Sequence, residues 1–457
     1  MVPLDAFRDR RIVVLGLGKS GVATARAAEA GGADVLAWDD NADRRAALGG
    51  IAMRDPAGLD WQAGDILSPA PGIPLTHPAP HPVIAAALAA GATVAGDIEL
   101  FAKACPAAVM VGVTGTNGKS TTTALIAHLL NHCGVAATAA GNIGQAVLDL
   151  DPPAPGSVQV LELSSYQLDL TQAFRPKVGV FLNLTPDHLD RHGGMDGYMA
   201  AKARLFANMG EGDTAVVGID DDWGRALADN LKERGLSVVR ISVLGPLAKG
   251  IAVVDGQMTV DGEPIASLAG AATLPGRHNH QNAAAAVAAC RALGCRTGDI
   301  VGGLASFPGL AHRIERIGEV RAVSFYNDSK ATNADAASRA LGAFENIYWI
   351  AGGKPKEGGL GPVLPFMGCV RRAYLIGEAM ALFASELAGE VETRMSGTLA
   401  TATEDAYADA KAAGGGVVLL SPACASFDQF PNFEARGNAF RAVAEHIIGR
   451  EREGGGA

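Results

Sequence analysis

A glycine-rich turn at residues 115–121, placed between a strand and a helix, constrains this chain more than any other feature. The turn reads GTNGKST, the apolar residues 108–113 before it predict a buried strand, and residues 121–130 predict a helix. A helix N-terminus attracts phosphate because its first N–H groups are unpaired and the positive end of its dipole lies there. We therefore expect a nucleoside triphosphate, with Lys119 on its outer phosphates and Ser120 on its magnesium ion. The predicted triphosphate-binding loop comprises Gly115, Thr116, Asn117, Gly118, Lys119, Ser120 and Thr121.

The match to the general phosphate-loop pattern is incomplete. That pattern places glycine five residues before the Gly–Lys pair, where this chain has Val113. Turns of Gly, Asn and Thr between strands and helices are also common without any ligand. The run of Lys119, Ser120 and Thr121 at the start of the helix nevertheless favours phosphate binding.

Length and charge narrow the class of protein. The 457 residues can form two or three domains, and the net charge of −10 argues against nucleic acid as a partner. The chain has no apolar run of membrane-spanning length and no signal-peptide pattern near Met1, so we expect a cytoplasmic protein without membrane insertion. We also expect a monomer. The six cysteines form no CxxC pair, which predicts reduced thiols, with no disulfide framework and no zinc site.

Alternating strands and helices predict an α/β protein of three domains. Residues 1–97 and 310–457 would be Rossmann-like domains, and residues 98–309 would be a central P-loop-type ATPase domain with a mostly parallel sheet. The first domain contains the turn GLGKSG at 16–21 and a strand at 34–38 that ends at Asp39. This pattern is typical of dinucleotide binding, but another ligand or a plain tight turn would produce it equally well.

Other short apolar runs complete the predicted sheets. Residues 245–272 are polar and glycine-rich, and they predict a small β excursion in the central domain. The further predicted strands are 11–15, 158–163, 178–182, 323–326, 348–350 and 417–420.

Two residues of the central domain are predicted to lie in a site. Glu162 interrupts an apolar strand, where a bare carboxylate is costly to bury unless a cation or donors compensate it. Beside a triphosphate loop we expect it to bind magnesium, with pairing to a lysine or arginine as the simpler alternative. His188 follows the strand at 178–182, at the edge where open α/β sheets bind ligands, and we expect it to bind metal or to orient another group.

Local pattern alone leaves three other residues open. Lys202 lies among small and apolar residues of a predicted helix and, by itself, indicates a solvated lysine. Asn279 and Asn282 open an alanine-rich helix, where an N-cap with a polar first turn is the plain interpretation.

Polar loops follow the strands of the third domain. They contain His312 and Arg313, NDSKATN at 327–333, GGKPK at 352–356 and SPACASFD at 421–428. Their lysine and arginine side chains predict an open binding site for anionic ligands.

The order of these motifs closely resembles the Mur ligase family, and specifically its D-glutamate-adding members. The motifs span all three predicted domains and are highly specific when taken together. They are GTNGKST, LELSSYQL, NLTPDHLDRH, YMAAKARLF, GRHNHQN, HR, NDSKATN, GGKPK and SPACASFDQF. The sequence DNPR is typical of the diaminopimelate-adding relatives. This chain lacks it, which supports the glutamate branch.

The resemblance implies an ATP-dependent amide ligase of peptidoglycan synthesis, and therefore a part in cell-wall formation, cell shape and cell division. ATP would phosphorylate the terminal carboxylate of UDP-N-acetylmuramoyl-L-alanine, and the amine of D-glutamate would displace phosphate from the acyl phosphate. Because two anions meet in the first step, magnesium and lysines are needed to screen them.

The resemblance also implies roles for individual residues. The catalytic residues would be Lys119, His188, Lys202 and Lys330. ATP would contact the triphosphate-binding loop together with Asn279, Arg313 and Asp328. The UDP-sugar would contact Lys19, Ser20, Gly21, Asp39, Gly72, Asn142 and His188. D-glutamate would contact Thr332, Lys356, Ser426, Phe427 and Phe433, with Lys354 as the alternative to Lys356. Magnesium would be held by Ser120, Glu162, His188 and Lys202, the last as a lysine carbamylated by carbon dioxide.

Three other functions compete with this interpretation. A folylpolyglutamate synthase would share the ATP and glutamate domains but would lack the first α/β unit with its turn at 16–21. An NAD-dependent oxidoreductase fused to a nucleotide-binding module would bind NADH and would show no amino-acid-dependent ATP turnover. A nucleotide-sensing protein without activity would bind ATP but release no phosphate.

Overall fold

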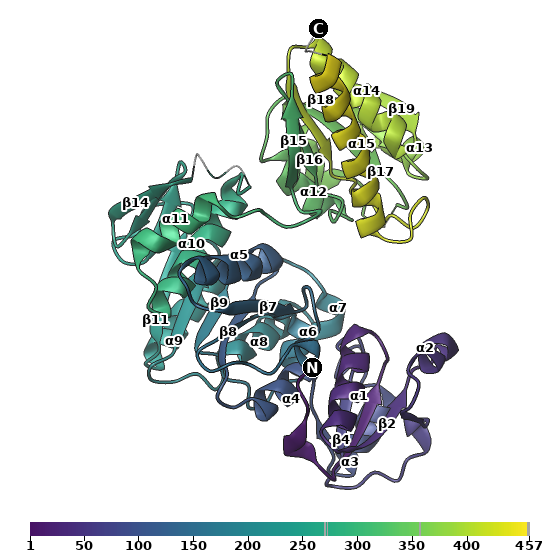
Figure 1. Cartoon of the computed structure of the whole chain (residues 1–457), viewed down its shortest axis with the longest axis vertical. Helices are drawn as coiled ribbons and strands as arrows, with labels where there is room; N and C mark the ends of the chain where they lie inside the picture. The colour runs from purple at the N-terminus through teal and green to yellow at the C-terminus, as the bar shows by residue number, and fades with distance from the viewer. Residues whose placement is uncertain (269–270, 272, 356–357, 455–457) are drawn as a thin grey trace. The chain divides into compact units, whose positions relative to one another are not determined.

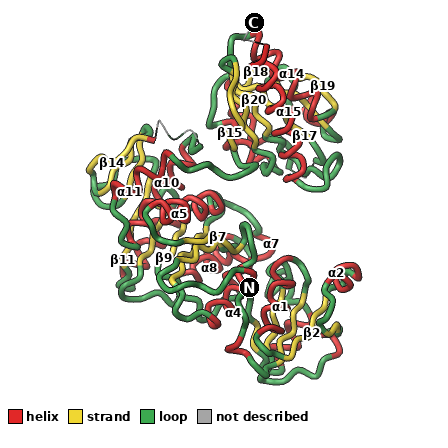
Figure 2. The backbone as a smooth tube through the Cα atoms, viewed as in Figure 1, coloured by secondary structure: helices red, strands yellow, loops and turns green. Residues whose placement is uncertain are grey.

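The computed structural model describes residues 1–268, 271, 273–355 and 358–454. Contacts between Cα atoms divide the chain into two compact units, which we describe separately (Figures 1 and 2). The first unit contains residues 1–268 and 281–305, and the second contains residues 269–280 and 306–457.

The first unit begins with a five-stranded sheet in the order β3-β2-β1-β4-β5, in which every neighbouring pair is parallel. Alternate side chains of β1 enter different hydrophobic cores, Ile12 and Val14 in one and Val13 and Leu15 in the other, so the strand is covered on both faces. The strands are β1 (Arg11–Leu15), β2 (Asp34–Trp38), β3 (Ala52–Met53), β4 (Ile66–Pro69) and β5 (Thr93–Val94). The helices are α1 (Lys19–Ala30), α2 (Ala42–Ala47), α3 (Pro82–Ala89) and α4 (Asp97–Ala104).

The first unit also contains a nine-stranded sheet in the order β14-β13-β12-β11-β10-β9-β6-β8-β7. The pairs from β7 to β12 are parallel, and β12, β13 and β14 form antiparallel hairpins at one end of the sheet. The strands are β6 (Val109–Thr114), β7 (Ala137–Gly141), β8 (Val158–Glu162), β9 (Val178–Phe181), β10 (Thr214–Gly218), β11 (Ser237–Ser242), β12 (Ile251–Val254), β13 (Gln257–Val260) and β14 (Glu263–Ser267). The helices are α5 (Lys119–His132), α6 (Ser165–Asp169), α7 (Leu189–His192), α8 (Met195–Ala203), α9 (Asp222–Glu233), α10 (Arg277–Ala292) and α11 (Thr297–Ala305).

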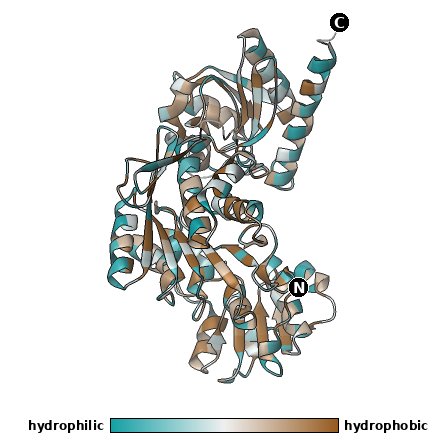
Figure 3. Cartoon of the chain, turned by 60° about the vertical axis from the view of Figure 1, so that its left-hand side comes forward, coloured by the Kyte–Doolittle hydropathy of each residue, from teal (hydrophilic) through white to brown (hydrophobic). Residues whose placement is uncertain are grey.

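The second unit is built on a six-stranded sheet in the order β15-β16-β20-β17-β18-β19, parallel except for the β15–β16 pair. Trp349 of β17 lies in one hydrophobic core, and its neighbours Tyr348 and Ile350 lie in another, as expected for a sheet covered on both faces. Figure 3 shows strands that are largely brown, at the hydrophobic end of the scale. The strands are β15 (Glu315–Val320), β16 (Val323–Asn327), β17 (Ile347–Gly352), β18 (Val370–Ile376), β19 (Thr393–Gly397) and β20 (Gly416–Leu420). The helices are α12 (Ala334–Leu341), α13 (Met380–Glu386), α14 (Leu399–Ala412) and α15 (Phe433–Gly454).

The predicted α/β class is confirmed, since all three sheets are mostly parallel. The small β excursion at 245–272 is confirmed as the β12–β14 hairpins, whereas α5 begins at Lys119, two residues before the predicted helix start. The domain boundaries at 97/98 and 309/310 stay predictions. Among the described residues we find no helix with the length and apolar character that crossing a lipid bilayer requires.

Strand order in the nine-stranded sheet positions the candidate site. β6 lies between β8 and β9, and all three run parallel, so their carboxyl ends share one edge. The triphosphate-binding loop follows β6, Glu162 ends β8, and His188 follows β9. Ligands of open α/β sheets bind at such an edge.

Candidate active site

The triphosphate-binding loop needs glycine at two positions. Gly115 and Gly118 have φ angles of 144° and 85°, in the region that other residues rarely adopt. A Cβ on Gly118 would also lie 2.2 Å from Oδ1 of Asn282. Asn183 holds the loop from the other side, because its Oδ1 accepts the N–H of Asn117 at 3.0 Å and its carbonyl accepts the N–H of Thr116 at 2.9 Å.

Two lysines converge on the backbone of this loop. Nζ of Lys119 donates to the carbonyls of Gly115 and Thr116 at 3.0 and 2.8 Å, and Nζ of Lys202 donates to the carbonyl of Gly115 at 2.8 Å. Lys202 is only 1% exposed. The local pattern indicates a solvated lysine, and that prediction is wrong. Its small helical neighbours let it pack inward, with Nζ 4.4 Å from the ring centroid of Tyr198. Burial, and then the charge of Lys119, hold the pKa of Lys202 well below its ordinary value.

Glu162 is the buried carboxylate of the site, at 2% exposure. Its Oε2 accepts the hydroxyl of Ser120 at 2.6 Å, and its Oε1 accepts the amide of Asn142 at 3.0 Å. Both partners are neutral, and a hydroxyl beside a carboxylate offers the hard oxygen ligands that magnesium prefers. No group of three or more His, Cys, Asp or Glu side chains among the described residues could hold a metal by itself. This pair therefore fits a magnesium ion whose other ligands are phosphate oxygens and water.

His188 lies at the start of α7 in a left-handed conformation, with φ of 52°. Its ring centroid is 5.0 Å from that of Tyr166, and its Nε2 is 3.5 Å from Oδ2 of Asp187. The side chain is 49% exposed, so it faces solvent at the strand edge.

The first glycine turn, between β1 and α1, is held by a carboxylate. Asp39 accepts the N–H of Leu17 at 2.7 Å and the N–H of Asn41 at 2.9 Å. Burial opposes ionisation of Asp39, but these hydrogen bonds and Arg44 outweigh it and lower the pKa of the carboxyl.

The other residues predicted for the UDP-sugar lie at the start of α1, in the loop after β4 and in the loop after β7. Ser20 and Gly21 border a small hollow together with Asp97. Lys19 donates a hydrogen bond to the carbonyl of Gly144, and the carbonyl of Gly72 accepts one from Arg191 at 2.8 Å. Asn142 lies apart from the turn, on Glu162.

In the second unit, Asp328 is a buried carboxyl between two strand-end loops. It accepts the Ser421 hydroxyl at 2.8 Å and the N–H of Ile314 at 3.2 Å. Burial raises the pKa of Asp328 to about 7 in spite of these bonds. Arg313, on the same loop as Ile314, is half-buried.

Phe433 lies close to another residue of the predicted glutamate site. Nζ of Lys330 lies 5.0 Å from the ring centroid of Phe433, and the loop N–H of Thr332 donates to the carbonyl of Lys330 at 2.9 Å. Ser426 is buried, whereas Phe427 beside it is 68% exposed. Lys354 donates its N–H to the carbonyl of Ala425 at 2.9 Å. Lys356 lies outside the described residues.

Asn279 occupies the first turn of α10 and is buried. Its side-chain amide donates to the carbonyl of Pro275 at 2.8 Å. The carboxamide therefore fixes the turn that precedes the helix from the third helical residue, and this donor contact is not the N-cap of the plain interpretation.

Comparison with known proteins decides the family. Residues 113–290 match the model of the Mur ligase middle domain, and residues 312–424 match that of the Mur ligase glutamate ligase domain. The chain is 50% identical to the UDP-N-acetylmuramoylalanine–D-glutamate ligase of Nitrobacter winogradskyi, over 98% of this chain and 99% of that protein. It is 51% identical to the enzyme of the same name from Rhizobium meliloti, over 96% of this chain and 97% of that protein.

The chain belongs to the Mur ligase family. The resemblance read from its motifs is thus confirmed, and the relatives favour neither the folylpolyglutamate synthase nor the oxidoreductase alternative. The solved structure of UDP-N-acetylmuramate-alanine ligase from Thermotoga maritima aligns with 96% of this chain and 99% of its own, with a TM-score of 0.58 at 19% identity. That likeness shows a shared Mur ligase fold.

One buried side chain of this Mur ligase had no predicted role. Arg436 of α15 is 1% exposed, and its guanidinium donates to Oγ and the carbonyl of Ser329, at 3.0 and 2.8 Å, and to the carbonyl of Cys424 at 3.0 Å. Burial lowers its pKa to about 10, so it remains charged at neutral pH. Arg436 therefore ties together the two loops that carry Lys330 and Ser426. It follows the SPACASFDQF motif by only a few residues, but nothing in its own neighbourhood marks it as buried.

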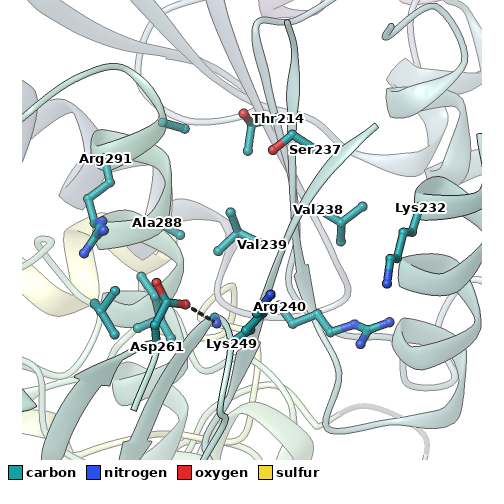
Figure 4. A pocket seen from close by; sticks show the side chains of 14 residues that line it. Thr214, Lys232, Ser237, Val238, Val239, Arg240, Lys249, Asp261, Ala288 and Arg291 are labelled. Atoms are coloured by element: carbon teal, nitrogen blue, oxygen red, sulfur yellow. Dashed lines mark hydrogen bonds between the residues drawn. The ribbon is translucent and has the colours of Figure 1, made fainter. Parts of the chain in front are cut away.

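A hollow of the first unit lies away from these residues of the Mur ligase. It measures about 550 Å³ and includes Thr214 and Ser237, the first residues of β10 and β11. These are the amino ends of the strands, opposite to the edge that carries the triphosphate-binding loop. Figure 4 shows Arg291 and Lys232 on opposite sides of this hollow, so these two cations do not converge on one anion.

Proposed function

We propose that this Mur ligase uses ATP to join D-glutamate to UDP-N-acetylmuramoyl-L-alanine. The observation that carries the proposal is the 50% identity, over almost the full length of both chains, to enzymes named for that reaction. The Lys119 cation on the triphosphate-binding loop supports it, because transfer of a phosphoryl group to a carboxylate brings two anions together. Small-molecule substrates, a monomeric state and a cytoplasmic location belong to the same proposal.

The reaction would proceed in two steps. An oxygen of the alanyl carboxylate attacks the γ-phosphorus of ATP, the bond to the bridging oxygen breaks, and ADP leaves. The amine of D-glutamate then attacks the carbonyl carbon of the acyl phosphate, loses a proton and expels inorganic phosphate. Phosphorylation is needed because a free carboxylate is a poor electrophile.

In the first step, Lys119 would turn from the loop carbonyls to the transferred phosphoryl group and offset its negative charge. Ser120 and Glu162 would hold the magnesium ion of ATP, which screens charge between the two anions. Asn142 would orient Glu162, and His188 would serve the muramoyl substrate or a second magnesium ion at the exposed strand edge.

Lys202 would act as a carbamate. Its lowered pKa supports this assignment, because only an unprotonated amine attacks carbon dioxide, forming a carbamate and releasing one proton. The modified side chain would carry a negative charge beside Lys119 and would bind a second magnesium ion. In the second unit, Asn279, Arg313 and Asp328 would contact the nucleotide, and Lys330, Thr332, Lys354 or Lys356, Ser426, Phe427 and Phe433 would contact the reacting phosphate and D-glutamate.

A phosphate-release assay tests the function directly. Purified protein with ATP, magnesium and UDP-N-acetylmuramoyl-L-alanine should release phosphate only when D-glutamate is added, and mass spectrometry should detect the new amide. L-glutamate and other amino acids are the matched controls for the amine. If D-glutamate yields neither phosphate nor amide, the proposed function is wrong.

A further inference from the structure

A row of stacked side chains runs from the Gly72 loop to the triphosphate-binding loop. Each member contacts the next through a ring face, and the members come from α6, α7 and α8. We call this row the aromatic ladder, and its members in order are Arg191, Tyr166, His192, Tyr198 and Lys202. The proposed function leaves Arg191, Tyr166 and His192 without a role.

Arg191 forms the outer end of the ladder. Its NH1 donates to the carbonyl of Gly72 at 2.8 Å, and its guanidinium carbon lies 4.8 Å from the ring centroid of Tyr166. A guanidinium over an aromatic face is attracted to the ring, and its planar shape fixes its orientation. The Nε atom is buried and has no hydrogen-bond partner among the described residues.

His192 is the rigid centre of the ladder. Its ring stacks on Tyr166 with centroids 5.4 Å apart and an interplanar angle of 17°, and Tyr198 lies 5.4 Å away on its other side. Its Nε2 is 2.9 Å from Oγ of Ser165, and its Nδ1 is 3.4 Å from the carboxylate of Asp169. Burial lowers the pKa of His192 to about 4, so the ring is neutral at neutral pH.

The inner end of the ladder reaches the triphosphate-binding loop. The hydroxyl of Tyr198 lies 3.4 Å from Oγ1 of Thr116, and Nζ of Lys202 lies over the Tyr198 ring and donates to the carbonyl of Gly115. Tyr166 also contacts His188, with ring centroids 5.0 Å apart. One ladder therefore contacts the Gly72 loop, His188 and the triphosphate-binding loop.

We propose that Arg191 is a positioning residue that holds the Gly72 loop, and the sugar nucleotide bound there, at a fixed distance from His188 and Lys202 through the aromatic ladder. The inference rests on the proposed function, because it assigns the sugar nucleotide to the Gly72 loop. Phosphoryl transfer needs its two reactants in near-contact, so a loosened loop impairs both binding and turnover.

Steady-state kinetics of Arg191→Ala test this role. We expect KM for the sugar nucleotide to rise about 10-fold and kcat to fall about 10-fold, since displacement of a reactant by about 1 Å is enough for such losses. KM for ATP and for D-glutamate should stay within about 2-fold, because neither is assigned to the Gly72 loop. Millimolar guanidinium should restore part of kcat in Arg191→Ala and should have no such effect on Arg191→Lys.

Tyr166 provides the matched pair of variants. Tyr166→Phe keeps the ring and should behave like the wild type, whereas Tyr166→Leu should reproduce the kinetic changes of Arg191→Ala. Circular dichroism and melting temperature identify any variant that fails to fold. If Tyr166→Leu fails to fold, Tyr166→Phe still tests the inference.

The outcomes separate the two proposals. A wild-type protein without D-glutamate-dependent turnover would overturn the proposed function and this inference together. An active wild type with an unchanged Arg191→Ala variant, or a Tyr166→Phe variant as impaired as Tyr166→Leu, would overturn the positioning role alone.

Discussion

The two glycine turns of the first unit share a local structure and differ in what surrounds them. Each follows the first strand of its sheet in chain order, β1 or β6, and each leads into a helix that begins with lysine, Lys19 in α1 and Lys119 in α5. In the first turn a carboxylate, Asp39, accepts a backbone N–H. In the second, the partly buried Lys119 and the buried Lys202 both donate to the carbonyl of Gly115.

This difference shows which part of such a motif selects the ligand. Glycine allows the backbone to turn, and the helix start supplies N–H groups in both cases. Side chains from other parts of the chain then separate a turn that an internal carboxylate holds in shape from one that two lysines contact. We therefore expect the first turn to bind a group that does not react, and the second to bind the group that is transferred.

Replacement of the two helix-starting lysines should give the largest contrast. Lys119→Ala should lower kcat by about 1,000-fold, because it removes charge that acts on the transferred phosphoryl group in the transition state. Lys19→Ala, the matched variant, should raise KM for the sugar nucleotide by about 10-fold and change kcat little, because its charge would act equally on bound substrate and transition state. Phosphate-release kinetics measure both, and comparable kcat losses in the two variants would remove the distinction.

Replacement of glycine at the start of each helix should give a smaller contrast. Gly118→Ala should destabilise the first unit by about 1–2 kcal/mol, since alanine is strained at this φ and its Cβ would meet Asn282. It should also weaken ATP binding. Gly18→Ala should be tolerated, because its φ is −73° and no atom lies within 4 Å of the added Cβ. Melting temperatures and ATP titration compare the two, and equal stability of both variants would contradict the assigned strain.

The smallest expected effect is a loss of stability of the first turn at acidic pH. The folded-state pKa of Asp39 is lowered, so its contribution to stability is present above the unfolded pKa of about 3.9 and is lost as pH falls through the lower folded value. Between about pH 5 and pH 3, the wild type should therefore lose more unfolding free energy than Asp39→Asn, by less than about 1 kcal/mol.

Urea unfolding followed by tryptophan fluorescence at several pH values measures this effect. Asp40→Asn, at the exposed neighbouring carboxyl, is the control for the removal of one charge from the same loop. An Asp39→Asn variant with the same acid sensitivity as the wild type would show that the carboxylate does not hold the turn.

The sequence predicts features that depend on neighbouring residues along the chain. The strands β1, β2 and β20 and the two glycine turns follow from apolar runs beside turn residues, and their predicted bounds agree with the structure to within one residue. Glu162 is conspicuous because a carboxylate stands out in an apolar strand. These signals are local, and they are sufficient for the α/β class and for the edge of the sheet that carries the site.

Features that depend on contacts between residues far apart in the chain cannot be predicted from local patterns. The burial of Lys202 requires the loop after β6, which lies 87 residues away in the chain, and Arg436 is paired with Ser329 across 107 residues. The contact of Arg191 with Gly72 spans 119 residues. A positively charged side chain is expected to be exposed unless its tertiary partners are known, so these three were missed or mistaken.

The antiparallel hairpins at the end of the nine-stranded sheet have a consequence for solubility. β14 is the outermost strand there, and it contains Pro264, whose nitrogen has no hydrogen to donate. A strand of another molecule that added to this edge would meet a gap in the ladder at that point, next to the charge of Glu263. The hairpins thus end the sheet with a strand that resists templated aggregation, which a bare parallel edge at β11 would invite.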